Sequence, residues 1–341
     1  MSMRISTEVL VVGGGPAGSA AAFWAAQSGR MVVLLEKDVM PRDRVCGDAV
    51  TPKAVGHLAE MGIDVTDKRF HKHRGLRMTA HGQSIELRWP TDHDHPSHGL
   101  IIRRNTFDKL LIDHAANEGA QVWTGVEVLQ PIVEHGHLRG CQALGSGKGS
   151  GPEGTIEVRA KFVIIADGPL SPFGRALGTA RTRRYAQGVA MRGYFPSAKH
   201  NEDIIESVFD LRDGNGHQLP GYGWVFPVGD GTVNTGVGLL SHHHGNDPSS
   251  IQQLFEQWLM QVPENWEIDI SNPEMSPKSG RLPMGASVRP RSGPNWLVVG
   301  DAAGSVNPFN GDGIEPALTN GKLAASVTNT AIKTGDGLEL R

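Results

Sequence analysis

The sequence has little cysteine, no surplus of charge of either sign and no long apolar run. Only Cys46 and Cys141 occur among the 341 residues, which excludes a disulfide framework and favours a reducing compartment. The 33 basic and 36 acidic residues nearly cancel, so a nucleic-acid partner is not expected. No apolar run approaches the roughly 18 residues that span a bilayer. We therefore expect a cytoplasmic protein, with peripheral membrane contact at most.

Glycine, by contrast, is in surplus. The chain has 44 glycines, whereas average usage would give about 24 in a chain of this length. They follow no three-residue period, which excludes collagen, and 38% hydrophobic residues with a net charge of -3 argue against disorder. Glycine in excess marks backbone that needs positive φ or that another group approaches closely. The positions of the glycines therefore carry the functional information.

A dinucleotide-binding fingerprint follows the first apolar run and opens a helix: Gly13, Gly15, Pro16, Ala17 and Gly18. Without side chains the turn can approach a pyrophosphate, and the helix N-terminus then faces the negative charge. A second apolar run ends at Glu36, just before Lys37 and 18 residues past Gly18, which is close to the usual spacing for a ribose-binding acid. Such an acid argues against a 2′-phosphate, so the pattern predicts NAD or FAD rather than NADP.

Two further glycine turns follow apolar runs. Asp167-Gly168 is, by itself, typical of an ordinary β-turn. Gly300-Asp301 precedes a second glycine-rich helix start, which comprises Gly311, Gly313 and Ile314. A strand-end acid followed by such a helix start predicts another polyol and phosphate site. FAD needs this second site for its ribityl chain, whereas NAD needs only one.

In this order the three turns resemble those of the FAD-dependent oxidoreductases with the p-hydroxybenzoate-hydroxylase-like fold, and the resemblance spans nearly the whole chain. It implies that Glu36 holds the adenosine ribose and that Asp301 holds the ribityl chain. It also implies that Arg104 contacts the flavin side and that the Val126 backbone faces the adenine. In the segment between Arg104 and Val126, the pattern of apolar residues predicts a helix from about Phe107 to Glu118.

Two segments narrow the family. One runs from Arg44 to Val55 and begins Arg44-Val45-Cys46-Gly47-Asp48, and the other is Pro220-Gly221-Tyr222-Gly223-Trp224-Val225-Phe226-Pro227. They resemble the Cys-Gly loop and the PxYxWxFP motif of the geranylgeranyl reductases, and within that family the chain is most similar to the menaquinone reductases of actinobacteria. The resemblance implies FAD as the cofactor and a prenyl lipid or prenylquinone as the substrate. It also implies cofactor contacts from four residues of the loop: Arg44, Cys46, Gly47 and Asp48.

The side chains of these two segments each allow a functional and a structural interpretation. Tyr222, Trp224 and Phe226 alternate along an expected strand, so all three should point to one face. They can line an apolar channel that binds a polyprenyl tail as substrate, or they can form an ordinary sheet core. Cys46 is the catalytic candidate, as a thiol near the flavin that gates the site or donates a proton, or it is a small turn residue.

These patterns predict an α/β fold with an α+β insertion, in which an antiparallel-sheet substrate domain interrupts a Rossmann-like FAD-binding domain. We expect the FAD-binding domain in residues 1–73, 98–180 and 285–341, with a short C-terminal region. The substrate domain is expected in a hairpin at 74–97 and in residues 181–284. The segment Gly145 to Gly154 is expected to be a flexible hairpin tip.

The leading hypothesis is an FAD-dependent reductase that saturates an isoprenoid double bond of the menaquinone side chain or of a geranylgeranyl group. Two alternatives stay open: an FAD-dependent aromatic monooxygenase, and a truncated, non-catalytic flavin or lipid binder. The electron donor, NAD(P)H or another reductant, is not identified because no second nucleotide fingerprint is visible. The histidines at 93–98 and 242–244 lack the spacing of a zinc helix, so no metal is predicted.

Overall fold

The computed structural model describes residues 3–91, 95–182, 184–185, 187–213, 216–240 and 248–335. The predictions for His93 and for residues 242–244 lie outside these ranges. The chain forms two compact units, which are described separately. Unit 1 comprises residues 1–42, 105–185 and 283–341, and unit 2 comprises residues 43–104 and 186–282.

Unit 1 is built on a mostly parallel sheet with the order β19-β20-β11-β1-β2-β8. The strands are β1 (Met3–Val12), β2 (Val32–Glu36), β8 (Gln121–Thr124), β11 (Gly154–Ile165), β19 (Ser292–Gly293) and β20 (Trp296–Val298). All neighbouring pairs from β20 to β8 are parallel, so the carboxyl ends of these strands lie at one edge. The predicted Rossmann-like fold is confirmed.

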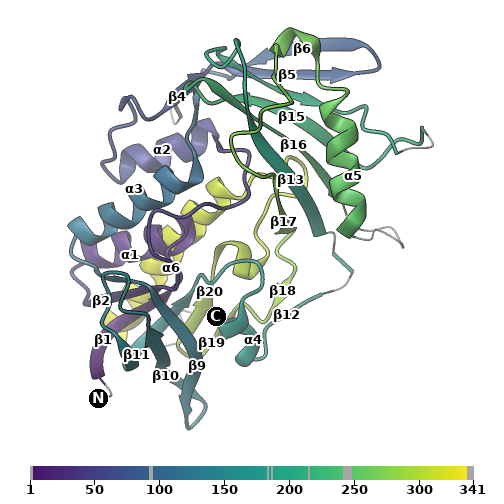
Figure 1. The fold of residues 1–341 in the computed structure, drawn as a ribbon. Helices are drawn as coiled ribbons and strands as arrows, with labels where there is room; N and C mark the ends of the chain where they lie inside the picture. Colours follow the sequence, from purple (N-terminus) through teal and green to yellow (C-terminus); the bar gives the residue numbers. More distant parts are fainter. Residues whose placement is uncertain are drawn as a thin grey trace. The chain divides into compact units, whose positions relative to one another are not determined.

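Helices cover this sheet, and Figure 1 shows α1 (Pro16–Gln27) and α6 (Ile314–Thr334) side by side. Helix α1 begins after Gly15 with a proline in its first turn, where the missing N–H of proline costs nothing. Helix α3 spans Arg104–Asn117 and so begins three residues before the predicted Phe107. The earlier start has a physical reason, because the Arg104 N–H donates to the distant Asp48 carboxylate at 3.2 Å.

A β-meander extends the sheet of unit 1. Strands β9 (Val126–Glu134) and β10 (His137–Gly145) run antiparallel to each other, and β10 pairs with β11. The hairpin between β10 and β11 is as predicted, but its glycine-rich tip returns to β8, where the Thr124 N–H donates to Ser150 Oγ at 3.0 Å. The smaller elements of unit 1 are α4 (Pro172–Ala176), β12 (Ala180–Arg181), β18 (Val288–Arg289) and the short helix η2 (Gly300–Ala303).

Unit 2 contains a seven-stranded sheet with the order β17-β13-β16-β15-β14-β5-β6. The strands are β5 (Gly75–Ala80), β6 (Gln83–Arg88), β13 (Gln187–Pro196), β14 (Ile204–Val208), β15 (Gly221–Pro227), β16 (Thr232–Leu240) and β17 (Lys278–Pro283). The run β13-β16-β15-β14 is antiparallel, and so is the predicted hairpin of β5 and β6. The predicted separate antiparallel sheet is therefore confirmed.

One face of this sheet is covered by α5 (Pro248–Leu259), whose Phe255 and Trp258 pack on Val225 and Val237. Unit 2 also contains a small sheet with the strand order β3-β7-β4, and α2 lies next to it. The remaining elements of unit 2 are β3 (Ala49–Val50), α2 (Pro52–Glu60), β4 (His71–His73), β7 (Gly99–Ile101) and the short helix η1 (Glu264–Trp266). Within the described ranges, no helix has both the length and the apolar character that a bilayer crossing requires.

Candidate functional site

The predicted cofactor-binding turns all lie at the carboxyl edge of the unit 1 sheet. Gly13 follows β1, Asp167 follows β11, Gly300 follows β20, and Glu36 ends β2. The turns touch each other: a Cβ on Gly13 would collide with the carbonyl of Ala166, the residue before Asp167. Ligands of open α/β sheets bind at this edge, so the fold brings together motifs that are far apart in the sequence.

The fingerprint turn fits a pyrophosphate. Gly13 has φ +103°, and a Cβ on Gly18 would overlap the Gly13 carbonyl oxygen, so both positions require glycine. A Cβ on Gly15 would make one ordinary van der Waals contact within the described residues, with Arg42 Nη2 at 3.7 Å, so this side of the turn is less crowded than Gly13 and Gly18. The N-cap of α1 is Gly15, which offers no capping side chain, so within the part of the chain that the structure describes the first N–H groups of the helix can bind an anion.

Glu36 fits a ribose. Its buried carboxylate accepts the Gly14 N–H on Oε2 at 2.7 Å and the Asp38 N–H on Oε1 at 3.0 Å. Each oxygen of an ionised carboxylate has about two lone-pair sites, so Oε1, which accepts only the Asp38 N–H among the described residues, keeps capacity for a ribose hydroxyl. The backbone bonds fix the direction of the carboxylate before any ligand arrives. The neighbouring Lys37 is exposed.

Sequence reasoning missed Arg42 and Asp108, which support Glu36. Arg42 Nη1 donates to Asp108 at 2.5 Å, and its Nη2 lies 3.5 Å from Glu36 Oε2. Asp108 is fully buried on α3, and the Arg42 side chain is nine-tenths buried. The sequence does contain a signal for this pair. Asp108 lies among the apolar positions of its helix, and a buried acid needs a partner of opposite charge.

The Asp167 carboxylate forms hydrogen bonds within the loop that follows it. It accepts the Ser171 hydroxyl at 2.6 Å and the Phe173 N–H at 2.9 Å, and it thereby caps α4. Burial raises the pKa of Asp167 above its usual value, against these hydrogen bonds. Gly168 follows in the left-handed region with φ +81°. Asp167 therefore stabilises the loop between β11 and α4 at the carboxyl edge of the sheet.

The last two cofactor motifs meet at the start of α6. A Cβ on Gly313 would lie 3.6 Å from the Asp301 carboxylate, so the strand-end acid is next to the helix start. Asp312, which sequence reasoning did not single out, accepts the Ile314 N–H at 2.9 Å and caps the helix. Gly311 precedes it with φ +73°. The Asp301 carboxylate beside the helix start fits the polyol part of the predicted second site, whereas the first N–H groups of α6 are bonded to Asp312 rather than open to a phosphate.

The Val126 prediction also falls at the carboxyl edge. Val126 opens β9 directly after β8, whose Thr124 pairs with Glu36. Its side chain is buried in the core of unit 1, so only its backbone is left for a ligand.

Unit 2 brings the other two predicted segments together. The rings of Tyr222 and Trp224 lie 6.1 Å apart and those of Trp224 and Phe226 6.2 Å apart, so the prediction that they share one face of β15 is confirmed. A Cβ on Gly47 would lie 2.7 Å from the Phe226 ring. The Cys-Gly loop therefore packs directly on the aromatic strand, which explains why the loop needs glycine at this position.

The Cys46 thiol lies between two opposite charges. It accepts a hydrogen bond from the Asp48 N–H and bonds the Arg104 side chain. Burial raises the pKa of the thiol above its usual value; Arg104 opposes this shift, and the Asp48 carboxylate adds to it. Arg104, predicted from the resemblance as a flavin contact, is thus a neighbour of the candidate catalytic residue. Arg44 contributes its carbonyl, which accepts Arg192 Nη2 at 3.0 Å.

Asp48 is the most constrained residue of this loop. It is fully buried and has φ +66°, a left-handed conformation that costs a non-glycine residue about 1 kcal/mol or more. Its Oδ2 accepts the Tyr194 hydroxyl and the Asn234 amide, the latter at 2.9 Å. Burial raises its pKa from 3.8 to about 6, although both hydrogen bonds and the nearby Arg192 and Arg104 favour the ionised form.

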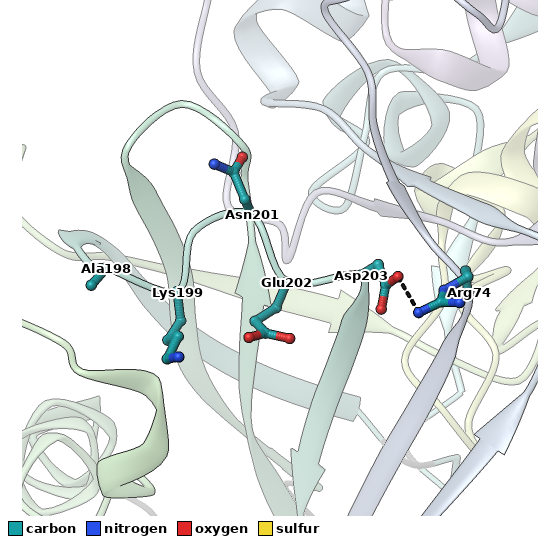
Figure 2. A pocket seen from close by; sticks show the side chains of 6 residues that line it. All are labelled: Arg74, Ala198, Lys199, Asn201, Glu202 and Asp203. Atoms are coloured by element: carbon teal, nitrogen blue, oxygen red, sulfur yellow. Dashed lines mark ion pairs between the residues drawn. The ribbon is translucent and has the colours of Figure 1, made fainter.

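A separate surface hollow of about 390 Å³ lies elsewhere on unit 2 (Figure 2). Arg74, Lys199, Glu202 and Asp203 line it, and Arg74 forms an ion pair with Asp203. Its charged lining does not suit an apolar chain.

Residues 6–331 match the FAD binding domain family. The chain belongs to this family and binds FAD. Over 97% of its length this flavoprotein is 38% identical to the menaquinone reductase of Mycobacterium tuberculosis, covering 78% of that protein. It is 30% identical to the digeranylgeranylglycerophospholipid reductase of Methanosarcina mazei, over 98% of this chain and 78% of that protein.

A geranylgeranyl bacteriochlorophyll reductase-like protein from Thermoplasma acidophilum has a similar structure. The TM-score is 0.83 at 28% identity, over 98% of this flavoprotein and 80% of that chain. The flavoprotein is therefore placed among FAD-dependent reductases by sequence and by fold together.

Ionisation of Asp48 should destabilise the folded flavoprotein. Because its pKa is 3.8 ordinarily and about 6 in the fold, the folded state holds a proton over an interval in which the unfolded state has lost it. Relative to Asp48→Asn, the free energy of unfolding of the wild type should fall as the pH rises through this interval, by about 3 kcal/mol in all. Denaturant titrations of both FAD-loaded proteins between about pH 4 and pH 7 measure this. Parallel pH dependences would contradict it.

Proposed function

We propose that this chain reduces an isoprenoid double bond of a prenyl lipid, with the menaquinone side chain or a geranylgeranyl group as the substrate. The observation that carries the proposal is the packing of the Cys46 loop on the aromatic strand of unit 2. The thiol loop thereby lies next to the rings of Phe226 and Trp224, which suit an apolar chain. The menaquinone and digeranylgeranylglycerophospholipid reductases among the relatives support the same substrate class.

The cofactor contacts follow from the carboxyl edge of unit 1. The fingerprint turn and the start of α1 would hold the pyrophosphate, because their N–H groups are not capped by a side chain. Glu36 would accept the adenosine ribose hydroxyls, and the Val126 backbone would face the adenine. Asp301 and the start of α6 would hold the ribityl chain. Arg42 and Asp108 would support this set by fixing Glu36.

The chemistry of the substrate defines what the protein must supply. FAD, when bound and reduced, supplies a hydride, and the other alkene carbon needs a proton. An isolated alkene has no carbonyl to absorb charge, so orientation and exclusion of water carry much of the catalysis. The rings of Tyr222, Trp224 and Phe226 would position the apolar chain, and their faces would ease positive charge on carbon. The Cys46 thiol, with its raised pKa, is protonated at neutral pH and can donate the proton.

Product analysis tests the proposed function. The FAD-loaded enzyme, reduced anaerobically with dithionite, should convert unsaturated menaquinone or geranylgeranyl diphosphate to a product that has gained two hydrogens, as measured by mass spectrometry. Oxidised enzyme without a reductant is the control and should leave both substrates unchanged. A product that has gained one oxygen in air would instead support the monooxygenase alternative. No conversion of either substrate by the reduced enzyme would contradict the proposal.

Replacement of the proton donor should slow turnover without loss of the cofactor. Cys46→Ser should retain FAD, and kcat should fall by roughly a hundredfold or more, because a hydroxyl is a much weaker acid than a thiol. Cys141→Ala is the matched control, since Cys141 is fully buried in the core of unit 1. This control should lose stability but keep its turnover. Full turnover in Cys46→Ser with FAD bound would remove Cys46 from the mechanism.

The ion pair beneath the ribose site should support FAD affinity. Asp108→Asn removes the anion that holds Arg42, so the dissociation constant of FAD should rise by roughly tenfold, as expected for a buried charge pair. Fluorescence titration of FAD into deflavinated enzyme measures this. Asp113→Asn on the same helix is the control, because Asp113 is exposed and, among the described residues, forms an ion pair with Lys109 alone. Equal dissociation constants for the two variants would show that the ion pair does not support the cofactor.

A further inference from the structure

The Cys46 loop is fixed at both ends by one strand of unit 2. Arg192 and Tyr194 are two residues apart on β13, so their side chains leave the same face. Arg192 Nη2 donates to Asp43 Oδ1 at 2.6 Å at the start of the loop. The Tyr194 hydroxyl donates to Asp48 at its end. A single strand therefore sets the distance that the six-residue loop must span.

A third side chain holds the middle of the loop. Asn234 lies on β16, directly opposite Tyr194 in the register of the two strands. Its amide donates to the Cys46 carbonyl at 2.8 Å and to Asp48 Oδ2 at 2.9 Å. Its carbonyl oxygen accepts Trp224 Nε1 at 3.0 Å. Asn234 thus connects the thiol loop to the aromatic strand, and both its amide nitrogen and its carbonyl oxygen are hydrogen-bonded.

The ring that bonds Asp48 is also held in place. The guanidinium carbons of Arg103 and Arg192 lie 4.4 and 4.5 Å from the centroid of the Tyr194 ring. Arg192 and Tyr194 are both almost fully buried. Such stacking and burial leave the Tyr194 hydroxyl little freedom to leave Asp48.

The hydrogen-bonded network of Asp48, Tyr194, Asn234 and Arg192 costs more free energy than a purely structural connection would need. A buried carboxylate and a buried guanidinium each carry a desolvation penalty, which apolar packing would avoid. The left-handed backbone of Asp48 adds a further cost. What the assembly does achieve is a fixed position for the Asp48 N–H, which bonds the thiol, and a fixed negative charge beside it.

We propose that Asp48 is a positioning residue which, held by Tyr194 and Asn234, fixes the Cys46 thiol in the orientation from which it donates its proton. The proposal rests on the role of Cys46 in the proposed function. In the step concerned, the S–H bond of Cys46 breaks and a C–H bond forms on the alkene carbon next to the one that takes the hydride of reduced flavin. The thiolate that remains faces the Arg104 guanidinium and regains its proton from water.

Alkylation of Cys46 by iodoacetamide tests the proposal without a prenyl substrate. The FAD-loaded wild type, Asp48→Asn and Tyr194→Phe are compared between about pH 6 and pH 9.5, with modified peptides counted by mass spectrometry so that Cys141 is separated. In Asp48→Asn the loss of the negative charge should lower the pKa of the thiol and raise the alkylation rate near pH 7.5, by about fivefold. In Tyr194→Phe the rate should also rise, because the loop is released at one end.

Thr235→Val is the matched control. Thr235 follows Asn234 on β16, and its buried hydroxyl donates to the Trp224 carbonyl at 2.6 Å and accepts Trp258 Nε1 on the side of α5. This variant should lose stability but keep the wild-type alkylation profile. In steady-state reduction, Tyr194→Phe should lower kcat and leave KM unchanged.

Wild-type alkylation rates at every pH in both Asp48→Asn and Tyr194→Phe would overturn the proposal, and so would equal changes in Thr235→Val. The alkylation result is independent of the substrate. A wild type that reduces no prenyl lipid, with the alkylation shifts present, would overturn the proposed function and leave the positioning of the thiol intact. Normal prenyl reduction without the alkylation shifts would overturn only the role of Asp48.

Discussion

The close approach of backbone to backbone at the carboxyl edge of unit 1 is the constraint on which the cofactor site depends. The turn after β1 touches the turn after β11, and a Cβ on Gly300 would lie 2.7 Å from Ala17 in the first turn of α1. Any side chain at Gly13 or Gly18 would separate these turns. Because the strands are parallel and in register, this local closeness aligns four motifs that the sequence separates by up to almost three hundred residues.

Much of unit 1 could be predicted because its signals are local. The fingerprint, its helix and the acid at Glu36 occur within one short βαβ stretch, where spacing alone has meaning. The shared face of Tyr222, Trp224 and Phe226 was predictable for the same reason, since alternation is a property of any strand. The family resemblance then joined the distant turns, and the match of residues 6–331 to the FAD binding domain family agrees with it.

The network around Cys46 could not be predicted in this way. Asp48 is 146 positions from Tyr194 and 186 from Asn234, and neither partner stands in a recognisable motif. Which of the polar residues on β13 and β16 face the loop depends on strand register, which is set by the fold. The start of α3 at Arg104 could not be predicted for a related reason, because the carboxylate that accepts the Arg104 N–H belongs to Asp48, far from the helix in sequence.

Besides turns with positive φ, glycine gives close approach in two places. At the fingerprint, glycine leaves space that a phosphate can use. In unit 2, a Cβ on Gly236 would meet the Trp224 ring, so glycine there lets the indole lie flat on the neighbouring strand and reach Asn234. A larger residue at position 236 would tilt the indole, break its bond to Asn234 and so disturb the amide that holds both Cys46 and Asp48. The geometry of the thiol therefore depends on a glycine that lies on β16, outside the Cys46 loop.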